Sequence, residues 1–225
     1  MNYLKYIYLL KRIHFYIFGE KFYKKLNYDW SKYPSRTEIL QEIINFKRYS
    51  KYLEIGCDQD ENFSKIKILE KVGVDPKSGG THRMTSDEFF LNNNQKFDII
   101  YIDGLHVYEQ AIKDIKNSIN FLNKDGIIIL HDCLPKKIWN QIVPQMYGHW
   151  NGDVWKAIVE ARTWKDVDTF SIIADHGLGV ILNKKNSSIL NKKITNFKKI
   201  KFKDYYVQHK EFMRPREYKD LKKYI

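Results

Sequence analysis

The clearest pattern in the chain is a series of short apolar runs, each of which ends at a glycine or at polar residues. Near-continuous apolar runs of this length indicate strands that are buried on both faces, as in a parallel sheet. Four such strands are predicted, at residues 51–55, 71–74, 97–102 and 126–130, together with a weaker one at residues 82–85.

Helical spacing separates several of these runs. Ile112, Ile115, Ile119 and Leu122 recur at helical intervals within residues 107–122, which lie between two predicted strands. This arrangement predicts a β-α-β unit with a right-handed crossover. A second helix is predicted from Thr37 to about Arg48, capped by Ser35, and a third is expected to start at Ser86.

The last two apolar runs differ from the earlier ones. Residues 169–174 and 178–182 are separated by Asp175-His176-Gly177, which predicts a hairpin because the connection is short and contains glycine. The sheet is therefore expected to be mostly parallel and to end in an antiparallel strand. We expect an α/β, doubly wound domain over residues 35–183, with an N-terminal extension at 1–34 and a C-terminal one at 184–225.

The two extensions have distinct patterns. Residues 1–34 begin with an apolar and aromatic stretch that Lys11 and Arg12 interrupt, so it is too short for the roughly 20 residues of a membrane span. It also lacks the small-residue cleavage site of a signal peptide. We expect an amphipathic helix packed on the domain; the alternative is a helix that lies on a membrane surface. Residues 184–225 are expected to be basic and largely helical.

Charge changes the picture mainly at the ends. The net charge is +12, with 14 Lys/Arg against 4 Asp/Glu in residues 184–225 and 10 against 4 in residues 1–50. The central part is mildly acidic. A solvated basic face is the favoured interpretation of the ends, and a nucleic-acid or other polyanionic partner is the alternative. The two cysteines do not form a CxxC pair, which argues against a cysteine zinc site and is compatible with a cytoplasmic protein.

Polar residues follow five successive predicted strands. In open α/β sheets ligands bind beyond the carboxyl ends of the strands, so these residues predict a cleft. The residues are Glu54, Gly56, Asp58 and Asp60 at the first strand, Asp75 at the second, Ser86 and Asp87 at the third, Asp103 and His106 at the fourth, and His131 and Asp132 at the fifth.

The first of these loops discriminates between cofactors. A dinucleotide site needs several glycines to bring helix amides onto a pyrophosphate, but this loop has only Gly56 and carries Asp58, Asp60 and Glu61. An acidic loop repels pyrophosphate and tolerates a sulfonium and an ammonium group. S-adenosylmethionine is therefore favoured over NAD, and Asp75 suits the two hydroxyls of a ribose.

With these motifs the chain resembles the class I methyltransferases, especially the branch of macrolide-sugar O-methyltransferases and cephalosporin hydroxylase-like proteins. The resemblance covers about residues 35–183 and implies a Rossmann-like sheet of seven strands in the order 3-2-1-4-5-7-6. The motifs that carry it are Tyr52-Leu53-Glu54-Ile55-Gly56, Val72-Gly73-Val74-Asp75-Pro76, Thr85-Ser86-Asp87-Glu88-Phe89-Phe90, the run from Phe97 to His106 and Leu130-His131-Asp132.

The resemblance also implies roles for individual residues. Glu54, Gly56 and Asp58 would line the cofactor cavity near the methionine part, Asp75 would hold the ribose, and Ser86 and Asp87 would flank the adenine. His106, with Asp103 beside it, would be the general base that takes a proton from the acceptor hydroxyl. In some relatives the residues that match Asp103 and Asp132 ligate Mg²⁺.

The sequence departs from the family pattern at two positions. Asp60 stands where a glycine is common, and His131 stands where relatives with a metal have a glutamate. Mg²⁺ prefers oxygen ligands, which the imidazole of His131 does not supply, so the metal of a site built from Asp103, His131 and Asp132 is left open between Mg²⁺ and another divalent ion. A two-histidine, one-carboxylate iron site is a further alternative.

Other conspicuous residues have plainer explanations. Residues 150–156 predict the start of a helix with Asn151 or Asp153 as its cap, and Trp155 is assigned equally to the core and to an acceptor pocket. His176 is attributed to the hairpin. His14, His82, His149 and His209 are expected to be structural or exposed.

The function expected from the sequence is therefore O-methylation of a hydroxyl on a sugar, glycan or small molecule, with S-adenosylmethionine as the donor. Methylation of RNA or DNA through the basic ends is one alternative, and a non-catalytic cofactor-binding scaffold is another. No Asn/Asp-Pro-Pro-aromatic motif for exocyclic amines is present, which argues against the nucleic-acid alternative.

Overall fold

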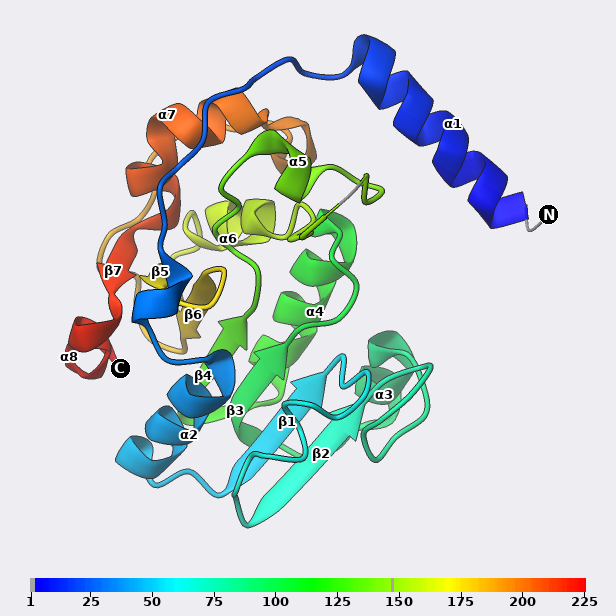
Figure 1. The fold of residues 1–225 in the computed structure, drawn as a ribbon. Coiled ribbons are helices and arrows are strands. Elements are labelled where there is room, and N and C mark those ends of the chain that lie inside the picture. Colours follow the sequence, from blue (N-terminus) through cyan, green and yellow to red (C-terminus); the bar gives the residue numbers. More distant parts are fainter. Residues whose placement is uncertain (1–2, 147) are drawn as a thin grey trace.

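A seven-stranded mixed sheet organises the chain in a computed structural model, which describes residues 3–146 and 148–225. Met1 and Asn2, part of the predicted N-terminal extension, lie outside the described residues. The strands are β1 (Lys51–Ile55), β2 (Glu70–Val74), β3 (Phe97–Ile102), β4 (Leu122–Leu130), β5 (Asp168–Ile173), β6 (Leu178–Leu182) and β7 (Pro215–Glu217). Their order across the sheet is β2-β1-β3-β4-β6-β5-β7 (Figure 1).

The predicted fold class is confirmed. β1 pairs in parallel with β2 and β3, β3 pairs in parallel with β4, and β6 is the antiparallel strand between β4 and β5. Six strands thus follow the predicted order. The weak strand expected at residues 82–85 is reduced to one parallel bridge between Val74 and His82, beside β2 where it was predicted. At the opposite edge, β7 pairs with β5.

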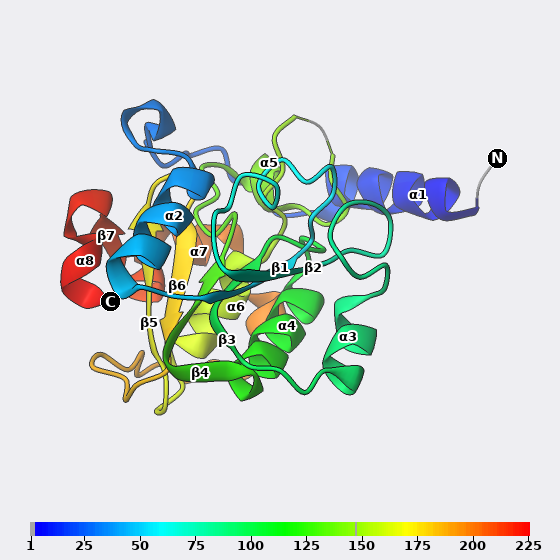
Figure 2. The same ribbon diagram turned by 90° about the horizontal axis from the view of Figure 1, so that it is seen from below.

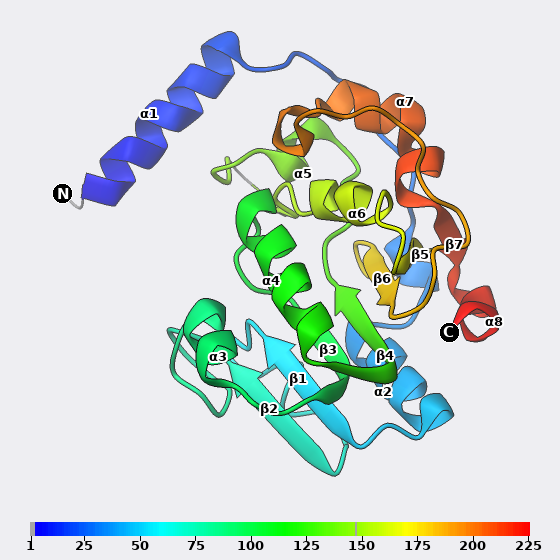
Figure 3. The same cartoon turned by 180° about the vertical axis from the view of Figure 1, so that it is seen from behind.

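Alternation along the strands divides the core between the two faces of the sheet, because successive side chains point to opposite sides. Leu53, Ile100 and Ile128 belong to one hydrophobic cluster, whereas Tyr52, Ile99 and Ile127 belong to the other. The first face is covered by α3 (Ser86–Asn92), α4 (Tyr108–Asn120), α5 (Ile138–Gln141), α6 (Trp155–Ala161) and α7 (Phe202–Met213). The second is covered by α2 (Arg36–Lys47) and α8 (Leu221–Tyr224), as Figures 1, 2 and 3 show. Three short 3-10 helices, η1 (Trp30–Lys32), η2 (Phe197–Lys199) and η3 (Tyr218–Asp220), complete the described elements.

Two predicted helix starts have different outcomes. Ser35 caps α2 and forms a capping box with Glu38, as predicted. By contrast, α6 begins after Val154 and has no side-chain cap. The predicted caps serve other elements: Asp153 Oδ1 accepts from the Tyr108 amide at 2.7 Å, and Asn151 Nδ2 donates to Asp132 Oδ1 at 2.7 Å.

The N-terminal helix α1 (Tyr3–Phe18) extends away from the sheet (Figures 1 and 3). Its contacts with the domain include a ring pair of Phe15 with Trp139 and a hydrogen bond from Arg12 Nε to the Gln145 carbonyl at 2.7 Å. The prediction that this helix packs on the domain is wrong for most of its apolar surface. The reason is that the helix projects from the domain, so its contacts through Phe15 and Arg12 leave most of its apolar side chains uncovered. The exposed side chains are Tyr6, Tyr8, Leu9, Leu10, Ile13, Tyr16, Ile17 and Phe18.

None of the described helices has the length and apolar character that crossing a membrane requires. Residues 184–201 are largely irregular, so the helical part of the C-terminal extension consists of α7, α8 and the short 3-10 turns. Within this extension, Tyr205 of α7 packs on the fully buried Trp155 of α6, with ring centroids 4.7 Å apart. Trp155 is therefore a core residue.

Candidate active site

A cavity of about 490 Å³ opens at the carboxyl ends of β1, β2 and β3. A smaller cavity of about 220 Å³ adjoins it and shares four wall residues with it. Seven of the predicted site residues line the larger cavity, namely Gly56, Asp58, Asp75, Ser86, Asp87, Asp103 and His106, and Glu54 lines the smaller one. The strand-tip pattern thus converges on one continuous site.

Gly56 lies where the chain after β1 comes very close to the chain after β3. Its backbone has φ of +89°, and a Cβ atom built there would lie 2.3 Å from the Asp103 carbonyl oxygen. A side chain would therefore clash with backbone and also strain the dihedral. The loop after β1 can follow this path only because residue 56 is glycine.

The acidic loop after Gly56 keeps a glycine-like conformation without the usual glycine. Asp60 has φ of +61°, in the left-handed region that Asp tolerates better than most residues. Its carboxylate accepts a hydrogen bond from the Gly80 amide at 2.7 Å, which ties the loop to the segment after β2. The aspartate at this position therefore fixes the loop shape that glycine would otherwise permit.

Asp75 is buried in the wall of the larger cavity and already accepts three backbone hydrogen bonds. They come from the amides of Lys77 (2.7 Å), Ser78 (3.0 Å) and Asp58 (3.1 Å). Burial acts to raise the pKa of Asp75, but these amides hold it below its ordinary value. The carboxylate is therefore ionised and fixed in position, and it joins the loops that follow β1 and β2.

A polar network forms the opposite wall, at the start of α3. Ser86 Oγ donates to Asp114 Oδ1 at 2.6 Å, and Gln110 Nε2 donates to Asp114 Oδ1 at 3.0 Å and to Asp87 Oδ1 at 3.3 Å. Burial raises the pKa of Asp114 to about 6. Sequence reasoning identified Ser86 and Asp87 but missed Gln110 and Asp114, which lie on the helix behind them.

The smaller cavity pairs a buried carboxyl with a guanidinium. Glu54 is held by the Tyr52 hydroxyl and by Asn62 Nδ2 at 2.9 Å, and burial raises the pKa of Glu54 to about 7. Arg36 faces it from the start of α2, 3.8 Å from Asp103 and 3.9 Å from Asp175. Arg36 Nε is buried and makes no hydrogen bond within the described part of the chain. Sequence reasoning missed Arg36 as a site residue because it precedes the first strand.

His106 lies between two carboxylates. Its Nε2 is 3.1 Å from Asp103 Oδ1, and its Nδ1 is 3.4 Å from Asp132 Oδ2. Burial acts to lower the pKa of His106, but the hydrogen bond with Asp103 and the charge of Asp132 raise it overall. The imidazole therefore has a fixed orientation at the edge of the larger cavity, with Asp103 and Asp132 positioned to stabilise its protonated form.

The structure brings together Asp103, His131 and Asp132, which were predicted to bind a metal. Their ligand atoms lie within 4.8 Å of one another. However, His131 Nδ1 faces Asp103 at 3.2 Å and its Nε2 faces Asp175 at 3.3 Å. Burial opposes the charge, yet Asp103 and Asp132 raise the pKa of His131 well above its ordinary value. Both ring nitrogens face carboxylate oxygens, which favours an imidazolium over an imidazole with a lone pair for a metal.

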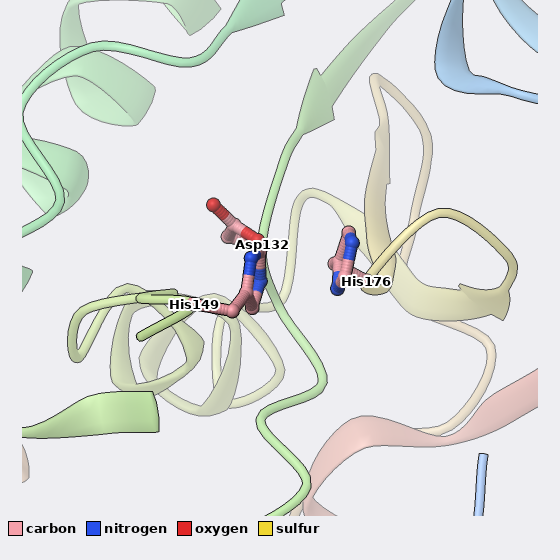
Figure 4. Close-up of side chains that lie close together, drawn as sticks. All are labelled: Asp132, His149 and His176. Carbon is pink, nitrogen blue, oxygen red and sulfur yellow. Dashed lines mark ion pairs between the residues drawn. The ribbon is translucent and has the colours of Figure 1, made fainter. Parts of the chain in front are cut away.

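Two further histidines gather beyond Asp132, as Figure 4 shows for Asp132, His149 and His176. His149 Nε2 lies 3.6 Å from Asp132 Oδ1, and the rings of His149 and His176 stack with centroids 3.8 Å apart and an interplanar angle of 23°. Burial and the neighbouring His149 lower the pKa of His176 to about 4. Sequence reasoning treated both histidines as structural or exposed, and no sequence spacing could have indicated that they meet.

Comparisons with known proteins agree with this geometry. Residues 50–133 match the family described as "Methyltransferase domain". A search of curated proteins finds no match. Among solved structures, a methyltransferase of Podospora anserina bound to SAH aligns with a TM-score of 0.51 and 16% identity, covering 69% of this chain and 81% of that one. An O-methyltransferase of Bacillus cereus in complex with SAH aligns with a TM-score of 0.51 and 10% identity, covering 82% and 92%.

The family match spans the strands that form the site, from β1 to the residues after β4. The solved structures share the fold over most of the chain. Residues 50–133 are therefore similar to a methyltransferase domain, and the chain shares the fold of solved methyltransferase structures.

Proposed function

We propose that the protein is an S-adenosylmethionine-dependent O-methyltransferase that acts on a hydroxyl of a sugar, glycan or other small molecule. The observation that carries the proposal is the position of His106 at the rim of an acidic cavity at the strand ends. The two structural neighbours, which are bound to SAH, support the choice of cofactor.

The charges of the two connected cavities suit a cationic cofactor with an amino-acid end. The larger cavity is lined by Asp58, Asp75, Asp87, Asp103 and Asp114 against Lys77, which favours a sulfonium over a pyrophosphate. The smaller cavity offers Glu54 to an ammonium group and Arg36 to a carboxylate. Bidentate recognition of carboxylates is a common role of arginine, and Arg36 Nε, which makes no hydrogen bond within the described residues, has a donor left for one. In this orientation Asp75 lies at the ribose and Ser86 at the adenine.

His106 is the proposed general base, and Asp103 orients it. The neutral imidazole takes the proton of the acceptor hydroxyl while that oxygen attacks the methyl carbon. The carbon–oxygen bond forms as the carbon–sulfur bond breaks, and the electron pair of the broken bond stays on sulfur, giving S-adenosylhomocysteine. The protein contributes mainly by aligning the two reactants. No step is assigned to a metal, because His131 does not fit as a metal ligand.

An acceptor screen tests the assignment. Transfer of a labelled methyl group from S-adenosylmethionine to a panel of hydroxyl compounds should occur with the wild-type protein. The His106→Ala variant should lose about 100-fold or more in kcat, the lower range for a general base. His209→Ala, on α7, is the matched control and should retain wild-type activity. Normal methylation by His106→Ala would refute the base assignment, and cofactor binding without any transfer would favour the scaffold alternative.

A second proposal concerns the N-terminal helix, which we propose lies on an anionic membrane surface. Its exposed apolar side chains include Leu9, Leu10, Ile13 and Ile17. The helix sequence contains Lys5, Lys11 and Arg12 but no Asp or Glu. Apolar side chains combined with exclusively basic charge are typical of helices at the boundary of anionic lipid.

A further inference from the structure

A separate cavity, of about 350 Å³, lies on the other side of Asp132 from His106. We call it the lysine cavity. It is lined by Lys25 and Trp30 from the N-terminal extension, by Lys136 and Lys137 from the segment after β4, and by the stacked rings of His149 and His176. Segments from three parts of the chain therefore meet around it. A backbone hydrogen bond from Leu26 to the Lys136 carbonyl (2.8 Å) holds two of these segments together.

The charge of the lysine cavity is opposite to that of the larger cavity at the strand ends, which we call the cofactor cavity. Its lining contains three lysines and no Asp or Glu, and within the described residues none of the three lysines forms an ion pair. Lys136 Nζ lies 5.0 Å from the centre of the Trp30 ring, a contact that leaves its hydrogen-bond donors available. Three lysines without carboxylate partners give the wall of this cavity a positive charge, which favours an anion bound there.

One carboxylate, Asp132, links the residues of the cofactor cavity to those of the lysine cavity. Asp132 Oδ2 lies 3.4 Å from His106 Nδ1, whereas Asp132 Oδ1 accepts from Asn151 Nδ2 at 2.7 Å, and Asn151 lines the lysine cavity. Asp132 thus contacts one residue from the wall of each cavity, namely His106 and Asn151. A molecule anchored among the lysines would lie next to the side of the site where His106 takes its proton.

The stacked histidines do not form a metal site, although their nitrogen atoms lie within 4.8 Å of each other and of Asp132. A metal ion lies in the plane of each imidazole that binds it. Rings stacked 3.8 Å apart and inclined by only 23° have no nearby point common to both planes. The pair instead presents a flat wall to the cavity, and Trp30 adds a third ring 5.6 Å from that of His176.

We propose that this cavity binds an anionic group, a phosphate or a carboxylate, carried by the molecule whose hydroxyl is methylated. The inference rests on the proposed methyl transfer and narrows its substrate class. The lysines would anchor the anion, and the rings of Trp30, His149 and His176 would border the body of the acceptor. Because the cofactor cavity is acidic and the lysine cavity is basic, the cationic cofactor and the anionic acceptor would bind in different cavities.

The test uses the protein saturated with S-adenosylhomocysteine and three matched probes, namely glucose, glucose 6-phosphate and glucuronate. Calorimetry should show that at least one charged sugar binds about tenfold or more tightly than glucose, because charge-assisted hydrogen bonds to one lysine are sufficient for such a difference. The two charged arms distinguish phosphate from carboxylate recognition. Raising the salt concentration should weaken their binding and leave that of glucose unchanged.

The double variant Lys136→Gln/Lys137→Gln should lose about tenfold or more in affinity for the preferred charged sugar. Its affinity for S-adenosylhomocysteine should stay within about twofold of wild type, since neither lysine lines the cofactor cavity. Lys192→Gln/Lys193→Gln, a matched pair on the far C-terminal segment, should leave both affinities unchanged. Equal binding of the three sugars, binding of none, or wild-type affinity in the Lys136/Lys137 variant would overturn this inference alone. Failure of S-adenosylhomocysteine to bind would instead overturn the proposed function.

Discussion

At the scale of single residues, the site depends on carboxyl groups whose surroundings set their charge. Amides keep Asp75 ionised, whereas burial raises the pKa of Glu54 to about 7. The strand-tip rule located both residues, because it needs only the ends of apolar runs. It could not locate Arg36 or His176, whose positions depend on how α2 packs against the sheet and on where the turn between β5 and β6 lies.

Glu54 should make cofactor binding depend on pH. The ammonium end of the cofactor favours the ionised carboxylate, which is mostly protonated at pH 6 and mostly ionised at pH 8 when its pKa is about 7. Affinity for S-adenosylmethionine should therefore rise by about tenfold from pH 6 to pH 8, with proton release on binding at the lower pH. Calorimetry in two buffers of different ionisation enthalpy measures both effects. The Glu54→Gln variant should lose this dependence, and an affinity that is flat with pH in the wild type would contradict the proposed role.

His131 should make a divalent metal dispensable. The protonated ring donates to Asp103 and Asp175 and already compensates the carboxylates on which a metal would otherwise act. Treatment with EDTA, followed by addition of Mg²⁺, is expected to change the methylation rate by less than about twofold in either direction. A rate that disappears with EDTA and returns with Mg²⁺ would instead support the site of Asp103, His131 and Asp132 predicted from the sequence.

At the scale of elements, the loop before α6 packs against the backbone of the proposed base, His106. Gly152 has φ of +65°, and a Cβ atom there would lie 1.8 Å from the His106 carbonyl oxygen. The sequence predicted a helix in this region, but it could not show that the residues before the helix support α4 and Asp132. Hydrogen-bond partners 45 and 19 positions away, Tyr108 and Asp132, decide the roles of Asp153 and Asn151.

Two glycines allow this support to be tested. Gly148 also has a positive φ, +67°, but open space surrounds the position of its Cβ atom, so it isolates the cost of the dihedral. Gly148→Ala should destabilise the protein by about 1 kcal/mol, the cost of a left-handed alanine. Gly152→Ala should cost about 3 kcal/mol or more, because backbone must also move, and it should lower kcat through the displacement of His106. Urea unfolding and steady-state kinetics measure the two effects; equal costs in both variants would show that the contact with His106 is unimportant.

At the scale of the whole molecule, the apolar runs predicted the α/β class, because burial on both faces leaves such runs. The resemblance to class I methyltransferases implied the order of the strands, and six of them follow it. It did not predict β7, a three-residue strand with Pro215 and two charged residues, which only the edge of the sheet can stabilise. It also misplaced α1, whose apolar residues indicate burial without indicating the partner. Neither the projection of α1 nor the lysine cavity follows from the apolar periodicity of the chain.

The helix α1 should confer binding to anionic vesicles. The wild-type protein should sediment with vesicles of phosphatidylglycerol and phosphatidylcholine more than with phosphatidylcholine alone. Leu10→Asp/Ile17→Asp should reduce this partition by about tenfold or more, since each buried aliphatic side chain contributes about 1.5–3 kcal/mol. Leu91→Asp, at an even more exposed leucine on α3, is the control and should leave it unchanged. Equal partition of the two variants would mean that α1 does not contact lipid.

The most direct test of the central claim is calorimetry of the protein with S-adenosylhomocysteine, in the wild type and in Asp75→Ala. We expect one site per chain in the wild type and a loss of affinity of about tenfold or more in the variant, because the carboxylate at the β2 tip orders the loop and is proposed to bind the ribose. Absence of binding in the wild type, with or without Mg²⁺, would contradict the account.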